Sequence, residues 1–102
     1  MAISDVQLKN NYYQIFDGKG KKIKEIPFNR VGELCGFGAE FIVFFKNNYF
    51  ATYDEDSDKI DETNISRVGD FKSVAGNYIN FVKNNYIGTY DEHFKKISER
   101  HI

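Results

Sequence analysis

Apolar and polar residues form short runs along the chain, a pattern typical of β-strands. Two successive sets of predicted strands cover residues 33–37, 40–45, 49–53 and 59–61, and then residues 70–74, 78–82, 86–90 and 96–99. These runs are rich in β-branched and aromatic residues, which strands favour. No segment shows the apolar period of three to four that indicates a helix. The pattern therefore predicts an all-β protein.

An internal repeat organises the chain. The tetrapeptide Lys-Asn-Asn-Tyr begins at Lys9, Lys46 and Lys83, with a spacing of 37 residues both times, and Arg-Val-Gly begins at Arg30 and again at Arg67. A fixed period of this length indicates repeated units that bury one another. We interpret residues 1–102 as a single all-β domain of three tandem ~37-residue antiparallel meanders. Residues 1–29 form an incomplete first repeat that lacks one strand, residues 30–66 the second and residues 67–102 the third.

The repeated Asn-Asn pair is predicted to form a two-residue hairpin loop. A tight hairpin with the correct twist needs positive φ at both loop positions, which Asn tolerates better than any residue except Gly. The strands before two of these loops are apolar on both faces, at residues 41–45 and 78–82. Strands of this kind lie inside a stack of sheets, covered on both sides. No polar capping repeat is evident at either end of the stack.

Each unit resembles a blade of a β-propeller, a four-stranded antiparallel meander with an apolar inner strand and a Tyr-Asp pair near the end of its third strand. The turn that begins at Asp17, followed by Gly-Lys-Gly-Lys, is similar to the Asp-x-x-Gly-Lys turn of many such repeats, WG-type repeats included. The resemblance implies a scaffold for binding and no catalytic residues. Propellers normally close with four to eight blades. Either two chains complete one ring, or the units form another three-fold all-β arrangement such as a β-trefoil.

Composition and charge exclude several classes of protein. The 102 residues suffice for one domain, and the net charge of -1 excludes a generally basic nucleic-acid binder. Aromatic residues make up 17% of the chain and there is one Pro, which argues against disorder. The longest apolar run, residues 41–45, is far too short to span a membrane. Without a visible signal peptide, and with Cys35 as the single cysteine, we expect a cytoplasmic protein.

The tyrosines and asparagines of the repeated hairpin are candidate binding residues. Aromatic faces beside amide groups are common in sugar and peptide sites. The alternative interpretation, which we favour, is that Asn forms the turn and Tyr packs between sheets. The candidate residues are Asn11, Tyr12, Asn48, Tyr49, Asn85 and Tyr86.

An acidic run in the second repeat resembles a calcium-binding loop. Its candidate ligands are Asp54, Asp56, Asp58 and Glu62, at positions one, three, five and nine. Lys59 stands where such a loop needs Gly, and the other repeats lack the acidic residues. We therefore favour a solvated hairpin turn and expect no bound metal or cofactor.

Catalytic signatures are absent from the sequence. His93 and His101 stand in no metal or nucleophile pattern, and the glycines near Lys19 lack the spacing of a phosphate-binding loop. We expect a non-enzymatic protein-interaction module, such as a small inhibitor or adaptor. The alternative is a carbohydrate-binding, lectin-like repeat protein. A missing strand leaves a sheet edge unpaired, so we also expect a homo-oligomer, most simply a homodimer.

Overall fold

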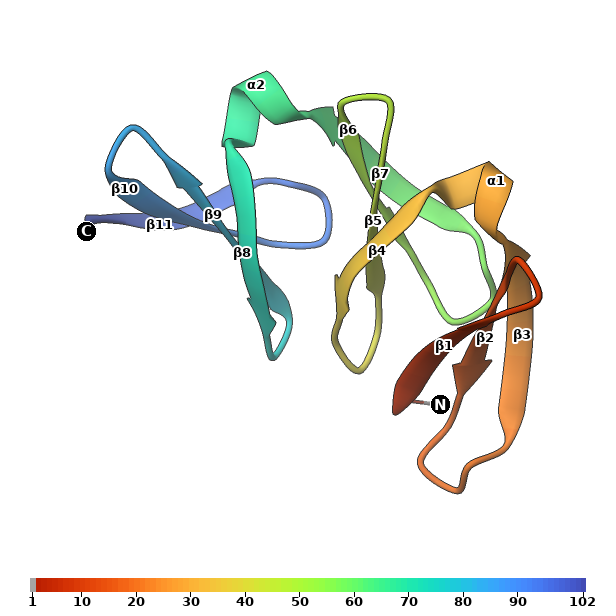
Figure 1. The fold of residues 1–102 in the computed structure, drawn as a ribbon. Coiled ribbons are helices and arrows are strands. Elements are labelled where there is room, and N and C mark those ends of the chain that lie inside the picture. Colours follow the sequence, from red (N-terminus) through yellow and green to blue (C-terminus); the bar gives the residue numbers. More distant parts are fainter. Residues whose placement is uncertain (1) are drawn as a thin grey trace.

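The structure, a computed structural model, describes residues 2–102 and consists mainly of three antiparallel β-sheets. The first sheet contains β1 (Asp5–Lys9), β2 (Tyr12–Phe16) and β3 (Lys22–Pro27). The middle sheet contains β4 (Glu33–Phe37), β5 (Ile42–Lys46), β6 (Tyr49–Tyr53) and β7 (Lys59–Asn64). The last sheet contains β8 (Asp70–Ala75), β9 (Tyr78–Lys83), β10 (Tyr86–Tyr90) and β11 (Lys96–His101). Strands pair in chain order within each sheet. The three sheets pack against one another in chain order, with the middle sheet between the other two (Figure 1).

The all-β prediction is confirmed, and the sheets contain three, four and four strands, as the missing strand of the first repeat implied. The strands predicted at residues 33–37, 49–53 and 86–90 have those bounds. Most others are one to three residues longer than predicted. Hairpin strands continue to pair up to the Asn-Asn loop, which adds Lys46 and Lys83. The strand predicted from residue 40 begins only at Ile42, after a bend.

Two single-turn helices connect the sheets, where the sequence predicted none. They are α1 (Phe28–Val31) and α2 (Ile65–Val68), and four residues are too few to show a helical period. Each ends at a glycine with positive φ, 86° at Gly32 and 91° at Gly69. A Cβ at Gly69 would collide with the backbone oxygen of Val82, so only glycine fits. This geometry accounts for the glycine of the repeated Arg-Val-Gly motif.

The predicted Asn-Asn hairpin loops are confirmed in every sheet. All six asparagines, Asn10, Asn11, Asn47, Asn48, Asn84 and Asn85, have φ between 51° and 69°. Positive φ at both loop positions defines the two-residue turn whose twist matches the flanking strands. The loop therefore fixes the register of each hairpin.

Two apolar layers hold the three sheets together. Between the first and middle sheets, the ring centroids of Tyr13 and Phe44 are 5.0 Å apart. Between the middle and last sheets, those of Phe50 and Phe81 are 4.9 Å apart. Successive residues of β5 face opposite layers, and Phe44 and Val43 are both fully buried. The prediction that this strand is covered on both faces is confirmed.

The prediction that a strand is covered on both faces is wrong for residues 78–82 of β9. Phe81 faces the middle sheet, but Asn80 points the other way and is only partly buried. The Asn80 amide donates to Ser73 Oγ at 3.2 Å and accepts from Thr89 Oγ1 at 2.7 Å. The three polar side chains form a ladder across three strands of the outer face. This strand is thus apolar on one face only.

Both outer faces of the stack are polar at their centres. On the first sheet, Gln14 lies beside Gln7 and Glu25 and donates to Glu25 Oε2 at 3.2 Å. On the last sheet, the ladder through Asn80 occupies the corresponding place. The prediction that neither end has a polar cap is therefore wrong, because the capping residues lie on separate strands and form no contiguous polar segment. Neither helix in residues 2–102 has the length and apolar content needed to cross a bilayer.

Candidate functional site: two equivalent pockets

Two shallow pockets lie beside the middle and last sheets, and they are built from the same repeat positions. The first has a volume of ≈ 280 Å³ and the second ≈ 300 Å³. The first is lined by Arg30, Val31, Lys46, Asn47, Tyr49, Ala51, Tyr53, Lys59 and Glu62. The second is lined by Arg67, Val68, Lys83, Asn84, Tyr86, Gly88, Tyr90, Lys96 and Glu99. Every lining residue of the second pocket lies 37 positions after one of the first.

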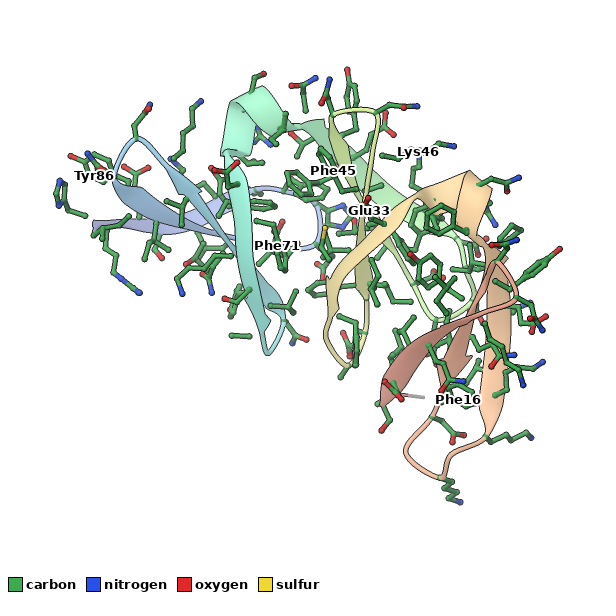
Figure 2. The ribbon with its side chains drawn as sticks, in the orientation of Figure 1. Phe16, Glu33, Phe45, Lys46, Phe71 and Tyr86 are labelled. Atoms are coloured by element: carbon green, nitrogen blue, oxygen red, sulfur yellow. The ribbon has the colours of Figure 1, made fainter. Side chains whose placement is uncertain are left out.

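Four elements supply each pocket. In the first pocket, the end of α1 supplies an arginine and the β5–β6 hairpin supplies Lys46 and Asn47. Alternate residues of β6 put two tyrosines on one face, with the small Ala51 between them. The small residue leaves the space, and Gly88 does so in the second pocket, where an added Cβ would lie 2.9 Å from the Tyr90 ring. Figure 2 shows Lys46 near the top of the middle sheet, next to α1.

Cations outnumber carboxylates in both pockets. The Arg30 guanidinium lies 5.5 Å from the centre of the Tyr53 ring, and that of Arg67 lies 6.0 Å from Tyr90. Each pocket contains one arginine, two lysines and a single glutamate, so its lining is positive although the whole chain has a net charge of -1. Arg30 donates one hydrogen bond to Ser57 O and Arg67 one to Thr63 Oγ1, each at 3.1 Å. A guanidinium has five N–H donors, so others remain for carboxylates and phosphates.

One lysine of each pocket is paired with its glutamate. Lys59 Nζ lies 2.7 Å from Glu62 Oε1, and Lys96 Nζ lies 2.6 Å from Glu99 Oε1. The hydrogen bond to the carboxylate raises the pKa of Lys59, and that of Lys96 in the same way, so both lysines stay protonated at neutral pH. The second lysine bonds a helix carbonyl: Lys83 Nζ donates to Ser66 O at 2.6 Å, and Lys46 to Asn29 O.

The first sheet does not form this pocket. Gln14 occupies the position of Ala51 and Phe16 that of Tyr53, so a larger amide stands where the pockets have a small residue and a ring without a hydroxyl where they have a tyrosine. Tyr12 lies instead in a separate depression with Asn11, Pro27, Phe28 and Asn29. The repeat therefore offers the same pocket twice among the described residues.

The structure divides the predicted binding residues into two groups. Tyr49 and Tyr86 line the two pockets and are 44% and 42% exposed, so they do not pack between sheets. Asn48 and Asn85 stand outside them, and their carbonyls accept from Ile65 N and Ile102 N. The asparagines that line the pockets are the preceding residues, Asn47 and Asn84. The arginines were missed as well, although Arg-Val-Gly recurs in the sequence.

The acidic run at residues 54–62 forms a hairpin turn. Asp54 Oδ1 accepts from the backbone N–H groups of Asp56 and Asp58 at 2.9 and 3.0 Å, while Glu62 pairs with Lys59. Asp17 and Asp91 make the same pair of bonds in their own turns. Within residues 2–102, no three His, Cys, Asp or Glu side chains come close enough together to hold a metal ion. The repeated aspartate thus shapes a turn.

Cys35, His93 and His101 are not among the residues that line the two pockets. Burial raises the pKa of the Cys35 thiol to about 11, so it is neutral at physiological pH. His93 Nδ1 lies 3.7 Å from Asp61 Oδ2, and the His101 ring packs edge-on against Tyr86 at 5.0 Å. Comparisons with protein families, with curated proteins and with solved structures found no match.

Proposed function

We propose that the protein is a non-enzymatic interaction module that binds an acidic segment of a partner protein through its two equivalent pockets. The observation that carries the proposal is the recurrence of nine lining residues at one spacing, with three cations and one carboxylate in each pocket. Two copies of one site on a rigid scaffold suit a ligand that repeats its chemical groups, because the second contact is made at high effective concentration.

The packing of three antiparallel sheets against one another supports this proposal. Repeat proteins present equivalent positions of successive units along one surface, and extended partners bind there. The two helices that supply the arginines, α1 and α2, lie on the same side of the three packed sheets (Figure 1). We therefore propose that the sheets act as blades that hold the two pockets at a fixed separation. A small inhibitor or adaptor in the cytoplasm is the role that this arrangement suits.

A lectin-like function is the second candidate. Tyr49 and Tyr86 are more than two-fifths exposed, and each shares its pocket with an asparagine. A sugar ring packed on the tyrosine with hydroxyls bonded to the amide would use this pair. The candidates differ in electrostatics, because a neutral glycan needs no arginine and its binding is insensitive to salt.

Binding of a fluorescent deca-glutamate peptide, measured by anisotropy at low salt, tests the first candidate. The Arg30→Gln/Arg67→Gln variant removes one cation from each pocket, and we expect its affinity to fall by about tenfold or more. Each single variant should leave one pocket intact and weaken binding less. Lys72→Gln/Arg100→Gln is the matched control, since it removes two exposed cations outside the pockets.

The outcomes separate the candidates. Equal loss in the pocket variant and the control would show non-specific attraction and overturn the proposal, as would no binding of the wild type. A glycan array run with the same proteins tests the alternative. A glycan signal that persists at high salt and disappears in Tyr49→Ala/Tyr86→Ala would favour the lectin-like function.

A further inference from the structure

The edge of the first sheet is open where the other sheets have a fourth strand. In the middle sheet β4 pairs with β5, and in the last sheet β8 pairs with β9, but within residues 2–102 the one strand that pairs with β1 is β2. The effect is visible at Leu8, which is 52% exposed, whereas Phe45 and Val82, its counterparts in the repeat, are only partly exposed. An open edge of this kind is a template for another strand.

The hairpin loop decides which backbone groups of β1 face the open edge. Lys9 and Tyr12 flank the two-residue loop, so these two residues bond to each other. Hydrogen bonding alternates along an antiparallel pair, and Gln7 and Asp5 therefore also bond to β2. The N–H and C=O groups of Val6 and Leu8 point outward. Val6 N–H is covered by Asp5 Oδ1 at 2.9 Å, a contact within its own chain.

The sequence of β1, Asp5–Lys9, is complementary to itself in the antiparallel direction. With Gln7 opposite Gln7 of a second copy, Val6 falls opposite Leu8, and Asp5 opposite Lys9. Val6 and Leu8 are the residues whose backbone groups point outward, so this register satisfies both of them in each chain. Asp5 and Lys9 then stand at a closely spaced pair position, where opposite charges stabilise the sheet.

We propose that two copies of this chain join through antiparallel pairing of their β1 strands, which makes one continuous six-stranded sheet around a two-fold axis. Leu8 then packs against Val6 of the other copy. Asp5 gives up its hydrogen bond with its own Val6 N–H and pairs with Lys9 of the other copy. The alternative of stacking the outer faces is disfavoured, because Gln14 and Asn80 place polar groups at their centres. The inference is independent of the function of the pockets, none of whose lining residues belongs to β1.

Charge exchange tests the register. Sedimentation across a concentration series should show the wild type reaching twice the 11.9 kDa chain mass. Asp5→Lys places lysines opposite one another, and Lys9→Asp places aspartates opposite one another, so each variant should remain monomeric at concentrations where the wild type is dimeric. An equimolar mixture of the two variants restores both ion pairs, and the dimer should return.

A second variant tests the edge itself. Leu8→Pro removes only an outward N–H and adds a ring at the edge, so the chain should keep its melting temperature at low concentration but lose the dimer. A wild-type monomer at every concentration overturns the proposal. A dimer that persists in Leu8→Pro, or in the single charge variants, would show that another surface joins the chains and would overturn it as well.

Discussion

The middle sheet and the two end sheets follow the same strand plan but treat the same repeat positions differently. On the side of the middle sheet that faces the last sheet, Val43 is fully buried, and Thr52 donates to Glu92 O in the β10–β11 turn at 2.6 Å. The equivalent residues of the last sheet, Asn80 and Thr89, bond to each other on an outer face. The comparison shows that position in the stack, rather than the repeat itself, decides which positions are apolar.

The first pocket lies on the side of the middle sheet that faces the first sheet, and the equivalent positions of the first sheet form no such pocket. Ala51 leaves space between Tyr49 and Tyr53, and α1 closes one side of it. In the first sheet the corresponding position is Gln14, whose amide fills an outer face and bonds to Glu25. Within residues 2–102, each of the two equivalent pockets has a helix on one side and a small residue, Ala51 or Gly88, at its centre. Both pockets therefore belong to complete repeats.

Exchanging the buried and capping residues gives the largest expected effect. Val43→Asn places an amide between two sheets, where Thr52 opposite it already donates to Glu92 O and Gly36 offers no side chain in place of Ser73. We expect the free energy of unfolding to fall by about 2–4 kcal/mol, because the amide cannot be fully paired there. The reciprocal Asn80→Val should cost less than about 1 kcal/mol, because its ladder partners are partly exposed. Urea denaturation measures both. Equal losses would contradict the assignment of the last sheet as an end.

The hairpin loops should give a smaller effect that is similar in the middle and last sheets. Asn48→Val and Asn85→Val each put a β-branched residue at φ 69°, and each should lower the free energy of unfolding by about 1 kcal/mol or more. Asn48→Gly, which tolerates this φ, is the control and should be nearly neutral. Unchanged melting temperatures in both valine variants would refute the role of the loops.

The reactivity of a thiol can be compared at one repeat position in two environments, the face of the middle sheet that the last sheet covers and the exposed face of the last sheet. Cys35 packs against the last sheet, while its counterpart Lys72 is exposed. With a pKa of about 11, Cys35 should react with Ellman's reagent at pH 8 about a hundred times more slowly than an ordinary thiol. Lys72→Cys in a Cys35→Ser background should react at the ordinary rate. Similar rates at both positions would contradict the burial of Cys35.

The raised thiol pKa also sets the direction of a pH effect. Because the folded pKa of Cys35 lies above the value of 9.0 for a free thiol, the unfolded chain loses this proton first as the pH rises. The contribution of Cys35 to stability is therefore complete below about pH 9 and is lost between pH 9 and 11. Cys35→Ala should remove this part of the pH dependence.

We expect calcium to have no effect on the melting temperature. Asp54 in the middle sheet bonds two backbone N–H groups, as Asp17 and Asp91 do in the end sheets, and the extra acidic residues of the middle turn form no cluster. Millimolar calcium should leave the melting temperature unchanged. A tight ion would raise it by mass action, and such a rise would identify the middle turn as a site.

Local patterns in the sequence determined the strands, the hairpin loops and the number of strands in each sheet. Alternation and the Asn-Asn pairs depend on neighbours in the chain, so residues 49–53 and 86–90 could be predicted without error. The one-turn helices could not, because they are shorter than the period that reveals a helix. The tyrosines beside the loops were candidate binding residues because they recur with the Asn-Asn pairs, but the favoured prediction that they pack between sheets is wrong for Tyr49 and Tyr86.

Only the tertiary structure decided which repeated residues meet. Arg30, Lys46 and Glu62 are far apart in the chain and form one pocket because α1, β5 and β7 converge on one face of β6. It also decided that Asn80 lies on an outer face, because none of the three sheets formed by residues 2–102 covers that side of β9. Both outcomes depend on packing between sheets, and a strand's sequence does not record what lies across from each of its faces.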